Sequence, residues 1–182
     1  MKLLITCSNT RINSNLISQL YHEKLFIIRN AGNIILENGK SFGCGEAAML
    51  ELAVEHLGVT EISVCGHTDC RAMKELMQHP ASWSKPMPSV QSWLSHAMKT
   101  KALVDDRCEL FGIQERLSAA EETNVMVQLE HLQSYPAVSK QLASGQLTLQ
   151  GLIYDIETGD VRPTTQQSPS FKKFMGERRA SE

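Results

Sequence analysis

The sequence has no marked excess of charge of either sign. Its 18 lysines and arginines nearly balance 20 aspartates and glutamates, so the formal net charge is -2. A nucleic-acid-binding domain normally concentrates basic residues on one face, so this balance argues against a nucleic-acid partner. We therefore expect small molecules or other proteins as partners.

Long apolar runs and internal repeats are also missing. No segment approaches the roughly 20 apolar residues that a membrane-spanning helix needs, and no secretory signal peptide is recognisable. We therefore expect no membrane partner and a cytoplasmic location. The length of 182 residues suits a single domain.

The cysteines form an odd set, which does not suit a framework of disulfides. They are Cys7, Cys44, Cys65, Cys70 and Cys108. In a reducing cytosol, cysteines are more often metal-binding, catalytic or buried than disulfide-bonded. Cys44, Cys65 and Cys108 have no partner at ligand spacing, and we interpret them as packing residues.

The order of apolar patterns predicts an α/β fold. Short apolar runs at 2–6, 25–28, 61–65 and 147–155 indicate strands, and helical patterns cover 46–57, 70–77, 90–101, 113–133 and 136–145. A strand, helix and strand joined by short connections form a right-handed crossover, so the strands at 2–6 and 61–65 should be parallel. We expect a single domain with a mainly parallel central sheet flanked by helices.

Three metal-binding side chains follow two of these strands. His67 and Cys70 are separated by two residues where the third strand gives way to a helix, and Cys7 ends the first strand. The carboxyl ends of parallel strands share one edge of the sheet, so the three side chains should meet there. Any one of them alone would more often be a core residue, but together they form a zinc ligand set with an open fourth position.

Several motifs resemble those of the β-class carbonic anhydrases, from Met1 to about Val161. They are Cys7 with Arg11 four residues later, Arg29-Asn30-Ala31-Gly32-Asn33, His67-x-x-Cys70 after Val64-Cys65-Gly66, Glu122-Thr123-Asn124-Val125, and Tyr154-Asp155-Ile156-Glu157-Thr158-Gly159. The likeness is greatest to the bacterial and cyanobacterial type, which includes carboxysomal forms. A β-carbonic anhydrase-like fold over residues 1–161 is therefore expected.

The resemblance implies a zinc ion held by Cys7, His67 and Cys70, with zinc-bound hydroxide attacking carbon dioxide to give bicarbonate. It also implies a homodimer or a higher oligomer. The family carries an aspartate two residues after the first cysteine and an arginine two residues beyond it. The aspartate accepts a hydrogen bond from the hydroxide, and the arginine holds the aspartate away from the metal.

The sequence departs from that pattern next to the predicted ligands. Asn9 stands where the family has aspartate, so it cannot form an ion pair with Arg11. An Arg11 without a carboxylate partner would favour an anion near the metal. We assign Asn9 and Arg11 to the catalytic positions. Arg71 replaces a glycine, and its side chain either points to solvent or reaches the site and binds an anion.

The two ends of the sequence also differ from the family pattern. Met1 leads directly into a strand, so we expect no helical arm before it, and residues 162–182 are expected to form a flexible tail. The pairs Lys172-Lys173 and Arg178-Arg179 are either solvated charge or a docking site for a scaffold protein, which would fit a carboxysome.

The leading prediction is reversible hydration of carbon dioxide to bicarbonate, with turnover reduced by Asn9. One alternative is a catalytically silenced zinc-binding paralogue that acts as a structural or regulatory subunit. A second keeps the zinc chemistry but applies it to another small linear substrate, such as carbon disulfide.

Overall fold

The computed structural model describes residues 1–12, 24–78, 85–107 and 111–164. Several predictions lie wholly or partly outside these ranges. They are the packing role of Cys108 and the basic pairs of the tail, and two further expectations from the sequence, a helix or turn at 12–20 and a proline-rich break at 79–89.

One five-stranded sheet forms the centre of the molecule, in the order β2-β1-β3-β4-β5. Its strands are β1 (Lys2–Cys7), β2 (Leu25–Asn30), β3 (Glu61–His67), β4 (Thr148–Tyr154) and β5 (Val161–Pro163). Adjacent strands are parallel except for the β4–β5 pair. The predicted mainly parallel sheet is confirmed, and β1 is buried on both faces, with Leu3, Leu4 and Ile5 fully inaccessible.

Two strands continue further than their apolar runs. β2 extends through Asn30, because Cys7 pairs with it in register, and β3 extends to His67, which pairs with Tyr154. Backbone pairing with a neighbour prolongs both strands into residues whose side chains are polar or small.

Strand β5 was not predicted from the sequence. Its three residues pair antiparallel with β4, and the Thr164 amide donates to the Gly151 carbonyl at 2.9 Å. Thr164 is 1% exposed. The structured chain therefore continues beyond residue 161, where we expected it to end.

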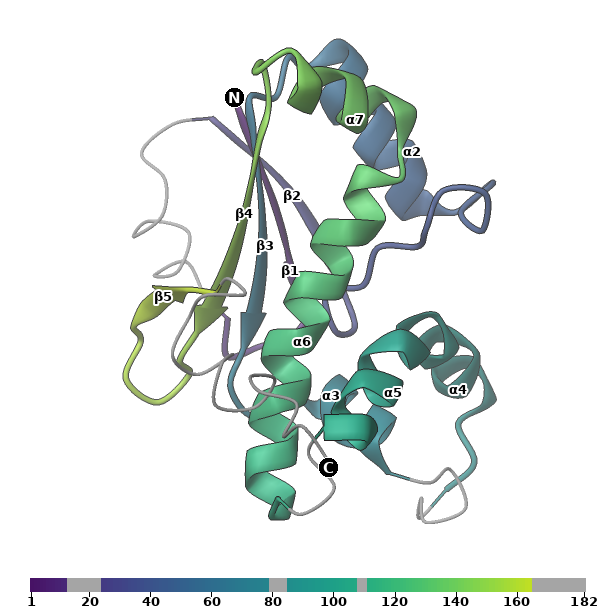
Figure 1. The fold of residues 1–182 in the computed structure, drawn as a ribbon, viewed down its shortest axis with the longest axis vertical. Coiled ribbons are helices and arrows are strands. Elements are labelled where there is room, and N and C mark those ends of the chain that lie inside the picture. The colour runs from purple at the N-terminus through teal and green to yellow at the C-terminus, as the bar shows by residue number, and fades with distance from the viewer. Residues whose placement is uncertain (13–23, 79–84, 108–110, 165–182) are drawn as a thin grey trace, which may run out of the picture.

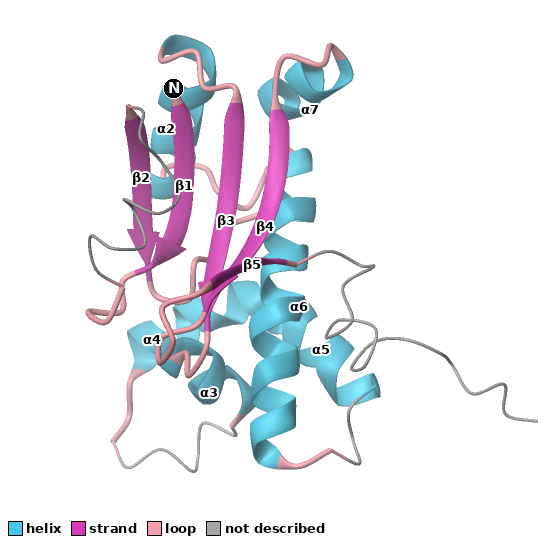
Figure 2. Ribbon diagram, turned by 90° about the vertical axis from the view of Figure 1, so that its left-hand side faces the viewer, coloured by secondary structure: helices cyan, strands magenta, loops and turns pink. Residues whose placement is uncertain are grey.

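The helices surround this sheet unevenly. They are α2 (Gly45–Glu51), the π-helical η1 (Leu52–His56), α3 (Arg71–Met77), α4 (Pro88–Leu94), the 3₁₀ turn η3 (Ser95–Ala97), α5 (Met98–Arg107), α6 (Ile113–Gln133) and α7 (Pro136–Ala143). Figure 1 shows α6 running along the sheet, with α2 and α7 at one end of the strands and α3, α4 and α5 near the other. Figure 2 shows α2 and α6 behind the sheet, and α3, α4 and α5 below the carboxyl ends of the strands.

The predicted helix over residues 46–57 has two parts. It is α-helical as far as Glu51 and then changes to the wider π-helical turn η1. The predicted helix at 90–101 is also longer, because Pro88 occupies the first turn of α4 and helical structure continues through η3 and α5. A proline is tolerated there, since the first amide of a helix has no intrahelical partner.

Two glycines allow α6 to approach the sheet closely. A Cβ atom on Gly66 would lie 2.8 Å from Val125 Cγ2 of α6, and one on Gly151 would lie 3.0 Å from Val125 Cγ1 as well as 2.8 Å from the Thr164 carbonyl oxygen. Such distances are shorter than carbon atoms tolerate, so a side chain at either position would displace its neighbour. The close approach brings polar residues of α6 beneath the ends of β1 and β3.

None of the helices in the described ranges is both long and apolar enough to span a bilayer.

Candidate metal centre

The three predicted ligands meet at the carboxyl edge of the sheet. Cys7 ends β1, His67 ends β3, and Cys70 is the N-cap of α3. Their two sulfur atoms and one ring nitrogen all lie within 4.8 Å of one another. The side chains are almost inaccessible, at 5%, 1% and 1% exposure respectively. The predicted convergence is therefore observed, across about sixty residues of sequence.

The imidazole of His67 is oriented to bind a metal through Nε2. Its Nδ1 atom lies 2.8 Å from the Thr68 carbonyl oxygen. A carbonyl oxygen only accepts hydrogen bonds, so Nδ1 carries the proton and Nε2 keeps a free lone pair. Within the described residues, Nε2 is buried and has no hydrogen-bond partner. A buried, unpaired ring nitrogen beside two sulfur atoms is what a metal ion would satisfy.

The two thiols favour a single negative charge in the absence of a cation. The pKa of Cys7 is lowered to about 4, mainly by a hydrogen bond from Cys70 and also by the Gly32 amide, which lies 3.3 Å from its sulfur. The pKa of Cys70 is raised, because a second thiolate would lie beside the first in a buried place. A bound cation would remove this repulsion and allow both cysteines to ionise. The donor set therefore fits zinc.

Glu121 of α6 forms a hydrogen bond with the backbone of Cys70. Its Oε1 accepts a hydrogen bond of 2.8 Å from the Cys70 amide, and burial raises its pKa to about 7. The sequence prediction did not include Glu121. The only feature of the sequence that could have pointed to Glu121 is its position directly before the motif that begins at Glu122.

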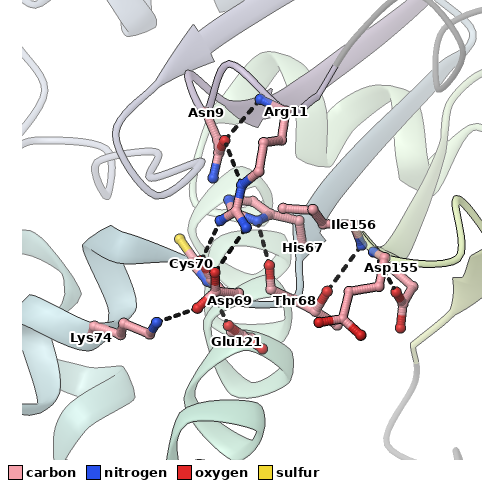
Figure 3. A network of polar contacts seen from close by, with 11 residues as sticks. Asn9, Arg11, His67, Thr68, Asp69, Cys70, Lys74, Glu121, Asp155 and Ile156 are labelled. Atoms are coloured by element: carbon pink, nitrogen blue, oxygen red, sulfur yellow. Dashed lines mark hydrogen bonds and ion pairs between the residues drawn. The ribbon is translucent and has the colours of Figure 1, made fainter.

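Asn9 lies beside Arg11 with its amide orientation determined. Its Oδ1 accepts hydrogen bonds from the Arg11 backbone amide at 2.9 Å and from Arg11 Nε at 3.4 Å. Only the oxygen of the side chain can accept, so Nδ2 is the group left for another partner. Figure 3 shows this nitrogen turned toward the side on which His67 and Cys70 lie.

Arg11 has a carboxylate partner, contrary to the expectation from Asn9. Arg11 Nη1 lies 2.8 Å from Asp69 Oδ2, and Lys74 contacts the other oxygen of the same carboxylate. The pKa of Asp69 is lowered by Lys74 first and then by Arg11. The prediction of an uncompensated Arg11 was wrong, because Asp69 adopts a left-handed conformation (φ 57°) that sequence reasoning did not foresee.

Arg71 points to solvent, which decides between the two alternatives for it. Its side chain is 87% exposed, and its Nε lies 3.6 Å from Glu75 one turn later in α3. Arg71 therefore does not reach the ligands.

Other residues of the quoted motifs hold the ligand-bearing backbone. The side chain of Arg29 donates to the carbonyl oxygens of Cys7, Asn9 and Ile12 at 3.3, 3.0 and 3.2 Å. Asn124 of α6 donates to the Gly32 carbonyl at 2.9 Å. These roles were not predicted, because they depend on loops folding onto β1.

Two other cysteines lie apart from the three ligands. The Cys44 sulfur accepts from the Ala47 amide at the start of α2. Cys65 is fully buried, and burial raises its pKa to about 12. Both agree with the packing role that the sequence predicted.

The fold and the three ligands define a class of zinc-binding α/β proteins, and comparison with known proteins gives the family. The family model described as carbonic anhydrase matches residues 2–161. The chain is 41% identical over 159 residues to a carbonic anhydrase of Synechococcus elongatus. This alignment covers 87% of this chain and 58% of the relative. For a carbonic anhydrase of Synechocystis the identity is 42% over 159 residues, with 87% and 57% covered.

Solved structures give the same answer. The structure of the β-carbonic anhydrase CcaA aligns with a TM-score of 0.82 at 42% identity, covering 88% of this chain and 77% of that one. The protein belongs to the β-class carbonic anhydrases. It spans 58% and 57% of the length of the two cyanobacterial relatives.

Proposed function

We propose that this chain catalyses the reversible hydration of carbon dioxide to bicarbonate, with one zinc ion held by Cys7, His67 and Cys70. The observation that carries the proposal is the convergence of these side chains within 4.8 Å, with His67 Nε2 buried and unpaired. Three protein ligands leave a fourth position, as catalytic zinc sites do. Membership of the carbonic anhydrase family supports this activity over a silenced zinc-binding subunit.

Zinc in such a site lowers the pKa of water and so supplies hydroxide as the nucleophile. The residues of this chain orient the groups around it. The Nδ1–H of His67 is held by the Thr68 carbonyl, which fixes the ring. The Gly32 amide donates to Cys7, and Glu121 fixes the backbone of Cys70. The ligands are therefore positioned before the metal binds.

Asn9 is the residue that we expect to limit turnover. Its Oδ1 already accepts twice from Arg11, so Nδ2 is the group left for a molecule bound at the site, and Nδ2 can only donate. An aspartate here would offer a second oxygen as an acceptor toward the nucleophile. Asn9 would therefore donate a hydrogen bond to an anion at the site but could not accept one from the nucleophile.

Stopped-flow hydration of carbon dioxide by the zinc-loaded chain tests this function. The wild-type chain should hydrate carbon dioxide above the rate of its metal-free form, and Asn9→Asp should raise kcat by about tenfold, as expected for one improved hydrogen bond in the transition state. Wild-type activity equal to that of the metal-free form, with zinc bound, would favour the silenced subunit.

We also propose a homo-oligomer, in which exposed apolar side chains such as Phe42 and Ile113 become covered. One related β-carbonic anhydrase structure, from Sordaria macrospora, is described as tetrameric. Light scattering during size-exclusion chromatography measures the assembly, and a monomer at micromolar concentration would contradict it.

We propose a cytoplasmic location because Cys44 and Cys65, which lie apart from the proposed zinc ligands, form no disulfide. Location in a carboxysome, with scaffold binding by the tail, stays a prediction.

A further inference from the structure

Asp69 lies between His67 and Cys70, and its two carboxylate oxygens contact different cations. Oδ2 lies 2.8 Å from Arg11 Nη1, while Oδ1 contacts the ammonium group of Lys74. Arg11 Nη2 also donates to the Asp69 carbonyl at 3.1 Å. As Figure 3 shows, the guanidinium meets both the side chain and the backbone of Asp69.

We propose that Asp69 is the carboxylate counter-ion of Arg11, and that it sets the electrostatic potential at the open coordination position. Asp69 acts as a positioning residue through Arg11 and does not touch the reacting atoms. The inference rests on the proposed function, because it concerns the same zinc site.

The sheet does not supply the connection that Asp69 makes. β1 and β3 pair in register only as far as Thr6 and Cys65. Beyond this pair, the backbone around Cys7 is not paired with the backbone around His67 in the β1–β3 register. The contacts between Arg11 and Asp69 link the segment after Cys7 to the segment that carries His67 and Cys70. The pair therefore holds both ligand-bearing segments in one arrangement.

The left-handed conformation of Asp69 makes this contact possible. A φ of 57° is uncommon outside glycine, asparagine and aspartate. It reverses the chain between His67 and Cys70, so both ligands can face the metal while the side chain between them faces Arg11. Asparagine tolerates the same conformation, so Asp69→Asn removes the charge without adding backbone strain.

Charge at the site can be altered in steps of one. Arg11, Lys74 and Asp69 together carry one net positive charge. Asp69→Asn raises it by one, whereas Lys74→Met lowers it by one. The double variant Asn9→Asp/Asp69→Asn leaves the charge unchanged and moves the carboxylate to residue 9, whose Oδ1 already accepts from Arg11.

The test measures anion affinity on the full chain loaded with cobalt(II), titrated with thiocyanate and followed by visible absorption. Asp69→Asn should bind thiocyanate about three- to tenfold more tightly, as expected for one extra positive charge near the metal. The double variant should return to within about twofold of wild type, because Arg11 regains a carboxylate.

The matched control is Asp106→Asn on α5, which changes the net charge equally at a side chain that is 80% exposed. It should leave the thiocyanate affinity unchanged. Unchanged affinity in Asp69→Asn, or a double variant that behaves like Asp69→Asn, overturns the proposal. If Asp69→Asn does not fold, Lys74→Met decides, since it should weaken binding by a similar factor, and unchanged affinity would overturn the proposal.

The same titration separates this inference from the proposed function. The cobalt spectrum of the wild-type chain before thiocyanate is added tests the ligand set alone. If the wild-type chain takes up no metal, the proposed function fails. Suppose instead that it binds cobalt and hydrates carbon dioxide when loaded with zinc, but that Asp69→Asn binds thiocyanate with the wild-type affinity. Only the counter-ion role then fails.

Discussion

At the scale of single residues, the chemical type of residue 9 decides which hydrogen bonds the side chain beside Arg11 can make. An aspartate offers two acceptor oxygens, whereas Asn9 offers one acceptor and one donor group. Arg11 uses that acceptor, so the donor end remains for the metal side. The charge that the side chain of residue 9 lacks is present at Asp69, on another segment of the chain.

The ligand assignment predicts different results for two cysteines. Cys70→Ser should lose stoichiometric zinc after dialysis, because a serine hydroxyl remains protonated and is a poor zinc ligand. Cys44→Ser should keep it, since Cys44 caps α2 and lies apart from the three ligands. Metal content by mass spectrometry is the measurement. Zinc retained by Cys70→Ser and lost from Cys44→Ser would contradict the ligand assignment.

At the scale of elements, α6 connects the core to the metal centre. Asn124 is 1% exposed, and its oxygen accepts from Gln128 Nε2 at 3.0 Å and from the Thr100 hydroxyl at 3.3 Å. Its nitrogen donates to the Gly32 carbonyl, and the Gly32 amide in turn donates to Cys7. A long helix thus positions a ligand on β1 through a buried polar network.

Removing this network should lower stability strongly. Asn124→Leu keeps the number and branching of the side-chain heavy atoms but leaves buried polar groups unpaired, so we expect the free energy of unfolding to fall by about 2–4 kcal/mol. Urea denaturation of the zinc-loaded protein measures it. The control Gln133→Leu changes an exposed amide of the same helix and should stay within about 0.5 kcal/mol. Equal losses in both variants would contradict the role of the network.

At the scale of the whole molecule, the metal centre should make stability depend on pH. In the metal-free protein, the hydrogen bond from Cys70, with smaller contributions from His67 and the Gly32 amide, outweighs burial and lowers the pKa of Cys7 from 9.0 to about 4. The unfolded state then binds more protons between these values, so the free energy of unfolding rises with pH across that window. Glu121 opposes this rise mainly below about pH 7, because its pKa is raised from 4.5 to about 7. The raised pKa values of Cys65 and Cys70 oppose it as the pH approaches 9.0, the ordinary value for a thiol.

Between about pH 7 and 8.5, the stability of the metal-free, reduced protein should therefore increase. Urea unfolding at several pH values checks the slope. Cys7→Ser should flatten it, because serine does not titrate in this range, and Cys44→Ser should retain it. A slope that survives in Cys7→Ser would show that another group causes it.

The sequence by itself determined the fold class and predicted which three side chains converge at the candidate metal centre. Buried parallel strands read as continuous apolar runs, and parallel strands end at one edge, so Cys7, His67 and Cys70 had to meet. These inferences depend only on local periodicity and chain direction. Strand β5 was not predicted, because three residues are too few to show the apolar periodicity of a strand.

Only the tertiary structure decided what surrounds the ligands. The contact of Arg11 with Asp69 depends on one left-handed residue, and the position of Glu121 depends on the close approach of α6 that Gly66 and Gly151 permit. Such contacts join residues far apart in sequence and follow from packing, which periodicity does not specify. The half-site at His67 and Cys70 was therefore predictable, whereas the partner that balances Arg11 was not.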